Sequence, residues 1–158
     1  MLHFAYGSNM HRGVMRRHAA QAVPLGAARL GDHRFIVTVD GYASTLPAPG
    51  RTVHGMLWRL RPRDRATLDH WENIAGGEYR AAFLPVRFDG GGCRALVYIA
   101  RPRPLGDAKP GYMEAVVAAA RELKLPADYI AELERWLPRR RRAAGHRNFG
   151  SFGPTEAA

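Results

Sequence analysis

Strand-like runs fill most of the first 100 residues of this chain, and sustained helical periodicity begins only after residue 111. Strands are predicted over 2–6, 34–39, 53–60, 79–88 and 93–100. Helices are predicted over 10–18, 62–72, 113–123 and 127–137. Because the strands surround short helices and a helical pair follows them, this order predicts an α+β fold with a mixed or barrel-like sheet.

Turn residues separate these runs. The Pro-Ala-Pro-Gly segment 47–50 predicts a turn before the third strand, and residues 89–92 predict the loop of a hairpin. Pro62 suits the first position of a helix, and the two glycines at 76 and 77 are expected to stop that helix. The strands are closely spaced and rich in glycine, which favours the strong curvature of a barrel.

The length of 158 residues suits one compact domain. We expect residues 1–137 to form this domain, because the four arginines at 139–142 follow Pro138 and lead into a segment with Gly, Ser and Pro. Residues 138–158 are therefore predicted to be a basic, mobile tail.

The net charge of +10 is concentrated at the two ends of the chain. Residues 1–60 carry seven Lys and Arg against two acids, and residues 138–158 carry five against one, whereas the 77 residues between them contribute only +1. Basic ends of this kind can contact a polyanion weakly, but they do not define a fold that reads nucleic acid. We therefore expect no nucleic-acid partner.

Several other classes of protein are excluded. No apolar run reaches the roughly 20 residues that cross a bilayer, and the first ten residues lack the pattern of a secretory signal, so we expect a cytoplasmic protein without a membrane partner. The single cysteine, Cys93, rules out an internal disulfide and a thiolate zinc cluster. The chain has no dinucleotide or P-loop fingerprint and no HExxH pair, so we expect neither a cofactor nor a metal.

The turn after the first predicted strand is one candidate for chemistry. The run Tyr6-Gly7-Ser8-Asn9 places small residues where a strand ends and a helix begins, which leaves several backbone N–H groups unpaired. Such a turn binds anions and carboxylates. A plain helix start capped by Ser8 or Asn9 explains the same residues equally well.

The segment Leu68-Asp-His-Trp-Glu-Asn73 is the other candidate, because it places Glu72 at the C-terminal end of a predicted helix. Backbone carbonyls at a helix end and partial burial beside an aromatic ring both raise the pKa of a carboxyl group. A carboxyl group in this position can serve as a general base. The competing interpretation is that Asp69 and Glu72 are solvated charges at a helix end.

Together these motifs resemble the γ-glutamyl cyclotransferase-like family. The matching residues are Phe4-Ala-Tyr-Gly-Ser-Asn9, Leu68-Asp69 with Glu72, Gly77-Glu-Tyr-Arg80, Gly55, Trp58 and Gly111-Tyr112. The resemblance covers residues 1 to about 137. Tyr-Gly-Ser-Asn after an N-terminal strand is a fairly specific mark, and the Leu-Asp-x-x-Glu motif some 60 residues later argues against chance agreement.

The resemblance implies a small mixed β-barrel with flanking helices, and an enzyme that needs neither metal nor cofactor. The implied reaction is attack of a small γ-glutamyl substrate's α-amine on its own γ-carbonyl, which releases 5-oxoproline and an amine or amino acid. Glu72 matches the family's catalytic glutamate and would carry the proton between the two nitrogens. The turn would supply N–H donors to the oxyanion, with Gly7 leaving room for the substrate. The implied substrate-binding residues are Tyr6, Gly7, Ser8, Asn9, Tyr79 and Tyr112.

The chain departs from the family pattern beside the glutamate. Asn73 stands where glycine commonly follows, so the sequence leaves the choice of substrate open. Glu78 is a second nearby carboxylate, which we expect at a strand entry facing solvent. Loops around 41–51 and 73–78 are expected to form the acceptor side of the pocket. The alternative to an enzyme is a non-catalytic binding module on the same fold, whose basic ends contact a polyanion.

Overall fold

The computed structural model describes residues 1–138. Its elements in chain order are β1 (Leu2–Ala5), the 3₁₀ turn η1 (Ser8–Met10), α1 (Arg12–His18), β2 (Val23–Val37), β3 (Ala43–Arg59), α2 (Pro62–Trp71), β4 (Tyr79–Phe88), β5 (Gly91–Ala100), α3 (Tyr112–Glu122) and α4 (Ala127–Glu134). The predicted strand 79–88 is found with the same bounds. All four predicted helices occur: three are shorter than predicted, and α3 is shifted by one residue toward the N-terminus.

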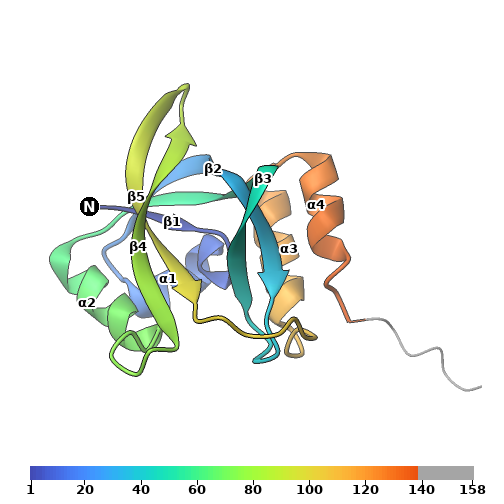
Figure 1. Ribbon diagram of the computed structural model, residues 1–158. Coiled ribbons are helices and arrows are strands. Elements are labelled where there is room, and N and C mark those ends of the chain that lie inside the picture. The colour runs from blue at the N-terminus through green and yellow to red at the C-terminus, as the bar shows by residue number, and fades with distance from the viewer. Residues whose placement is uncertain (139–158) are drawn as a thin grey trace, which may run out of the picture.

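The strands close into a barrel in the order β1-β3-β2-β4-β5. Neighbouring strands are antiparallel except β1 and β5, which are parallel and pair at His3 and Leu96. Figure 1 shows α3 and α4 together on one side of the barrel and α2 on the opposite side. The predicted α+β class, with a small mixed barrel and flanking helices, is confirmed.

β2 and β3 are much longer than the strands predicted at 34–39 and 53–60. β2 begins at Val23 and β3 begins at Ala43, so residues 47–50 lie within β3 and the turn predicted there is wrong. The chain reverses earlier, where the N–H of Gly41 donates to the carbonyl of Thr38 at 2.8 Å. Register shifts in β2 interrupt the ladder and bend both strands, as closure of a small barrel requires.

The hairpin predicted between the last two strands is found, but its loop is shorter. Asp89 and Gly90 connect β4 to β5, with φ angles of 48° and 74°. Two successive residues with positive φ are typical of the two-residue type I′ turn, whose twist matches that of the flanking strands. The predicted loop 89–92 therefore contributes its last two residues to β5.

The hydrophobic core fills the barrel and continues under the C-terminal helices. Phe4, Leu57 and Leu96 are fully buried on β1, β3 and β5, and Met113 and Leu133 extend the core from α3 and α4. β1 buries three successive residues instead of alternating, because both of its faces are covered. The end of β1 is therefore held rigidly, and this is the strand that leads into the Tyr6–Asn9 turn.

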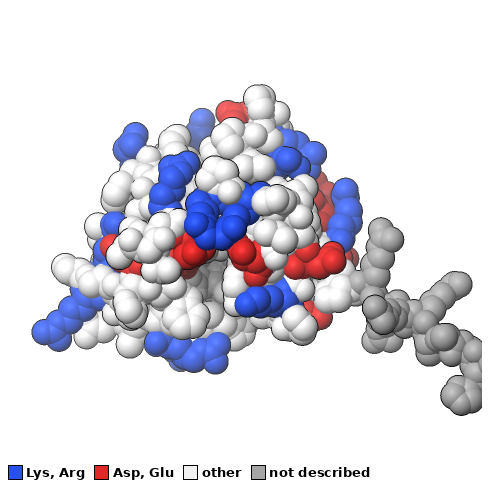
Figure 2. Space-filling view, turned by 60° about the horizontal axis from the view of Figure 1, so that its bottom comes forward, with Lys and Arg blue, Asp and Glu red and all other residues white. Residues whose placement is uncertain are grey.

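The surface of the described residues mixes both signs of charge. Figure 2 shows Lys and Arg side chains spread over the face turned forward, with Asp and Glu side chains among them. Within residues 1–138, no helix is long and apolar enough to cross a membrane. The arginines 139–142 and the rest of the predicted tail after Pro138 lie outside the described residues.

Candidate active site

The turn after β1 presents backbone donors. Two hydrogen bonds of 3.0 Å onto the carbonyls of Gly7 and Ser8 close the 3₁₀ turn η1. His11 caps α1, because its ring accepts a backbone N–H of the first helical turn at 3.1 Å. The capping role expected for Ser8 or Asn9 is therefore wrong. The N–H groups of Ser8 and Asn9 have no backbone acceptor in the described part of the chain.

Asn9 connects this turn to the end of α2. Its Nδ2 donates a hydrogen bond to Oε1 of Glu72 at 3.2 Å. Its Oδ1 is buried and has no hydrogen-bond partner within residues 1–138. The two motifs that are 63 residues apart in sequence thus meet in space, and an unused acceptor remains on the same amide group.

Glu72 occupies the C-cap position of α2. Burial raises the pKa of Glu72 from 4.5 to about 7, and the hydrogen bond from Asn9 opposes this increase. A carboxyl group with such a pKa can both accept and donate a proton near neutral pH.

Asn73, which follows Glu72, has a φ of 48°. This left-handed conformation favours glycine, and asparagine tolerates it better than most other residues do. Asn73 therefore preserves the backbone geometry for which glycine is usual. The helix ends at this point, before the predicted stop at the glycines 76 and 77.

Three of the predicted tyrosines use their hydroxyl groups to fix the surrounding strands. The hydroxyl of Tyr79 donates to the carbonyl of Ala43 at 3.0 Å, and the hydroxyl of Tyr112 accepts from the N–H of Ala43 at 3.2 Å. The hydroxyl of Tyr6 donates to the carbonyl of Tyr98 at 2.6 Å. Burial raises the pKa of Tyr6, so its phenol group stays protonated at neutral pH.

Gly7 is needed for close packing. A Cβ atom at this position would lie 2.7 Å from the hydroxyl oxygen of Tyr112 and 3.3 Å from Cβ of Ala43. The φ of Gly7 is −102°, so its backbone conformation is open to other residues. The sequence argument assigned this space to a substrate, but in the structure Tyr112 occupies it.

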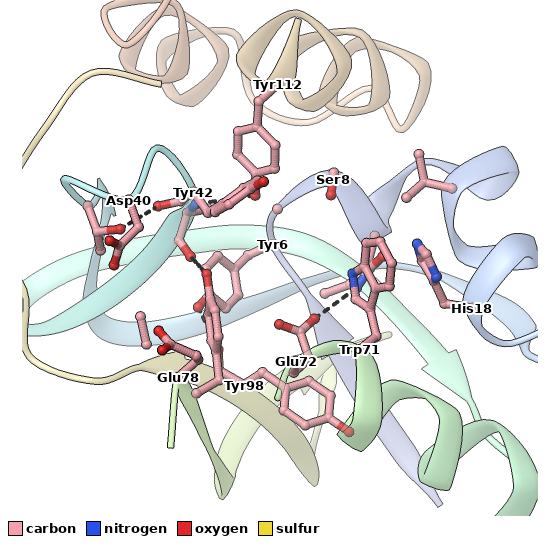
Figure 3. A pocket seen from close by; sticks show the side chains of 18 of the residues that line it. Tyr6, Ser8, His18, Asp40, Tyr42, Trp71, Glu72, Glu78, Tyr98 and Tyr112 are labelled. Atoms are coloured by element: carbon pink, nitrogen blue, oxygen red, sulfur yellow. Dashed lines mark hydrogen bonds between the residues drawn. The ribbon is translucent and has the colours of Figure 1, made fainter. Parts of the chain in front are cut away.

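One cavity of about 890 Å³ brings the predicted residues together. It is lined by Tyr6, Gly7, Ser8, Asn9, Glu72, Tyr79 and Tyr112. Figure 3 shows Glu72 between two groups, with Trp71 and His18 on one side and Asp40, Tyr42 and Glu78 on the other. The sequence analysis assigned no role to His18, Asp40 or Tyr98.

The loops around 41–51 and 73–78, which were expected to form the acceptor side of the pocket, are only partly found. Residues 43–51 belong to β3 and are not a loop, and the chain before them contributes Asp40 and Tyr42 to the cavity. Glu78 also lines the cavity, although its side chain is 41% exposed and pairs with Arg101 at 3.0 Å. Within residues 1–138 no group of three or more His, Cys, Asp or Glu side chains is arranged to hold a metal ion.

Comparison with known proteins identifies the family of this chain. A family model described as the AIG2-like family matches residues 52–133, which is just over half of the chain. The chain belongs to the AIG2-like family. The mouse γ-glutamylcyclotransferase (Mus musculus) is 27% identical over 146 residues, covering 84% of this chain and 77% of that protein. The human γ-glutamylcyclotransferase (Homo sapiens) is 25% identical over the same length and with the same coverage.

A solved structure has the same fold as this AIG2-like chain. The structure of a γ-glutamyl cyclotransferase superposes with a TM-score of 0.82 at 23% identity, covering 87% of this chain and 88% of that chain. The predicted γ-glutamyl cyclotransferase-like family is confirmed. The relatives support a γ-glutamylcyclotransferase-type function, and an enzyme of this family.

Asp69, the other carboxylate of the Leu-Asp-x-x-Glu motif, supports the cavity wall. It accepts a hydrogen bond of 2.6 Å from the hydroxyl of Tyr98 and pairs with Arg65 at 2.7 Å. Tyr98 was missed because it lies in an apolar run of β5, where a buried strand is the simplest interpretation. Only the register of the barrel turns its hydroxyl toward α2.

We predict that Tyr98→Phe lowers the free energy of unfolding by about 2 kcal/mol, since it removes a hydrogen bond to a charged group. Equilibrium urea denaturation measures this change. Tyr42→Phe is the matched control, because the Tyr42 hydroxyl makes no hydrogen bond to residues 1–138 and its ring is 39% exposed. Equal stability of the two variants would show that the contact with Asp69 contributes nothing.

Proposed function

We propose that this chain converts a γ-glutamyl amino acid or γ-glutamyl amine into 5-oxoproline and the free amine. The α-amine nitrogen of the substrate forms a bond to its own γ-carbonyl carbon, and the bond from that carbon to the acylated nitrogen breaks. One proton leaves the attacking nitrogen and one is delivered to the departing nitrogen. The reaction therefore consumes no second substrate.

The observation that carries this proposal is the carboxyl group of Glu72, which lies in the cavity wall with a pKa of about 7. An α-amine is mostly protonated at neutral pH, so a base must remove a proton before it can attack. The neutral amine then attacks, and the ammonium proton is released to solvent. A single carboxylate with this pKa can take the further proton that the attacking nitrogen loses as the new bond forms, and then deliver it to the leaving nitrogen. In our proposal Glu72 performs both transfers.

The turn supports the remaining roles. The N–H groups of Ser8 and Asn9 have no backbone acceptor among the described residues, although that of Ser8 is directed at the Tyr112 hydroxyl. In our proposal both N–H groups turn to the oxyanion that forms on the γ-carbonyl. We assign the buried Oδ1 of Asn9 to an N–H of the substrate, because an unpaired buried acceptor is costly until a donor reaches it. Tyr6, Tyr79 and Tyr112 are proposed to form the walls around the glutamyl head group.

The test is to detect 5-oxoproline by mass spectrometry after incubation with a panel of γ-glutamyl amino acids and γ-glutamyl amines. We expect 5-oxoproline and the released amine in equal amounts from at least one of these substrates. A protein that is folded but inactive on the whole panel would contradict the proposal. None of the findings supports the alternative of a non-catalytic module. Of the two basic ends that it invokes, the arginines at 139–142 lie outside the described residues.

The pH dependence of kcat/KM provides a second prediction. Because Glu72 must be ionised to accept a proton, kcat/KM should fall about tenfold per pH unit below a midpoint near 7. Asn9→Ala removes a hydrogen bond that lowers the pKa of Glu72, so it should move this midpoint to higher pH. A midpoint near 4.5 in the wild type would show that burial does not raise the pKa of the group being titrated, and an unchanged midpoint in Asn9→Ala would show that this group is not Glu72.

A further inference from the structure

The outer face of a stack of two aromatic rings forms a flat wall at one end of the cavity. Trp71 ends α2 and His18 ends α1, and their ring centroids lie 3.8 Å apart with an interplanar angle of 25°. Both line the cavity, and Figure 3 shows them together on one side of Glu72. Trp71 is 61% exposed, so a large apolar ring faces solvent next to the proposed catalytic carboxyl group. A ligand that covers this ring would gain apolar burial.

The wall carries no charge at neutral pH. Burial lowers the pKa of His18, and the nearby guanidinium of Arg17 lowers it further. The imidazole ring that stacks on Trp71 is therefore neutral under the conditions of the proposed reaction. A flat, uncharged surface of this kind is complementary to another aromatic ring.

The charged groups around the cavity differ between its two ends. On the side away from Trp71, Asp40 pairs with Arg103 at 3.1 Å and Glu78 pairs with Arg101 at 3.0 Å. Lys109 also lines that side, where its Nζ lies over the Tyr42 ring at 4.7 Å from the centroid. Arg17 also lines the cavity but pairs with no carboxylate of residues 1–138. A carboxylate of a ligand can therefore pair with Arg17 without breaking an existing ion pair.

The proton transfer by Glu72 decides which part of the substrate lies beside Trp71. Glu72 must reach the departing nitrogen, so the leaving amine begins at this carboxyl group, and Trp71 is its immediate neighbour in the chain. We propose that Trp71, His18 and Arg17 form a subsite for an aromatic amino acid as the leaving amine. Its ring stacks on the face of Trp71 that His18 leaves free, and its carboxylate pairs with Arg17. This assignment rests on the proposed function.

The main test compares kcat/KM for γ-glutamylphenylalanine and γ-glutamylalanine. We expect the wild type to prefer the phenylalanine substrate about tenfold, which corresponds to one aromatic contact and its buried area. Trp71→Ala should remove most of this preference, and His18→Ala should reduce it in the same direction. An unchanged ratio in both variants would overturn the proposal.

The role of Arg17 needs a substrate without the carboxylate. We expect Arg17→Gln to lower kcat/KM for γ-glutamylphenylalanine about tenfold, and to change it at most about twofold for γ-glutamylphenethylamine. An equal loss on both substrates would contradict the pairing of Arg17 with the leaving carboxylate.

Two controls separate this proposal from its alternatives. Phe83→Ala removes an exposed aromatic ring outside the cavity and should leave the substrate ratio unchanged. Tyr42→Ala tests the other end of the cavity, and loss of the preference in this variant alone would overturn our assignment.

If no substrate yields 5-oxoproline, the proposed function fails, and calorimetric binding of the same two compounds then tests the subsite. Equal affinities for wild type and Trp71→Ala would then reject it as well.

Discussion

Replacing Glu72 by glutamine is expected to lower the rate of 5-oxoproline formation by roughly 10³-fold, the usual contribution of a general acid–base. Glutamine has the same shape and can still accept the hydrogen bond from Asn9, so the site geometry should be retained. Single-turnover assays with mass spectrometric detection measure the loss. The control is Glu78→Gln, because Glu78 lines the same cavity but is paired with an arginine, and it should change the rate only a few-fold.

The same substitution should stabilise the fold at alkaline pH. The pKa of Glu72 is raised on folding, so between pH 4.5 and 7 the folded state binds more protons than the unfolded state, and stability falls as pH increases. Above pH 7 the folded state bears the whole cost of a buried charge, up to about 3 kcal/mol. Glutamine carries no charge, so Glu72→Gln should be more stable than the wild type at pH 8 and similar to it near pH 4. Urea denaturation at the two pH values distinguishes this effect from a pH-independent change in packing.

Features that depend on neighbouring residues were predicted well. The strand from Tyr79 to Phe88 and the helix that Pro62 begins follow from local composition, and both occur as expected. The motifs at Tyr6–Asn9 and Glu72 were recognised from sequence, and the structure brings them to one cavity. For these segments the local preferences and the final fold agree, which is the usual condition for a reliable prediction.

Features that depend on distant residues were not predictable in this way. Residues 47–50 have the composition of a turn, yet they lie within β3. Pro47 pairs with His33 and the next pair is Thr52 with Gly31, so residues 48–51 form a bulge in the ladder, where a proline is accommodated. Asn9 is a good capping residue by its type, but its amide group instead donates to a carboxyl 63 residues away. Local sequence cannot decide between helix capping by Asn9 and its hydrogen bond to Glu72, since the two residues come together only after the barrel has closed.

Close packing of β1 against β3 leaves no room for a side chain at Gly55, near the site. A Cβ atom at Gly55 in β3 would lie 2.2 Å from the carbonyl oxygen of Ala5 and 3.0 Å from the ring of Phe4. The carbonyl is backbone, so it cannot move away without displacing β1. We therefore expect Gly55→Ala to lower the free energy of unfolding by about 3 kcal/mol or more, measured by urea denaturation.

Gly92 in β5 is the matched control, because a Cβ atom there would meet no atom within 4 Å and alanine should change stability by less than about 1 kcal/mol. Similar stability of the two variants would mean that β1 is not held against β3 at Gly55. β1 ends at Ala5, and the turn with the proposed oxyanion donors begins at the next residue. A displaced β1 must carry this turn with it, so any folded Gly55→Ala protein should also lose 5-oxoproline formation, although Gly55 itself does not line the cavity.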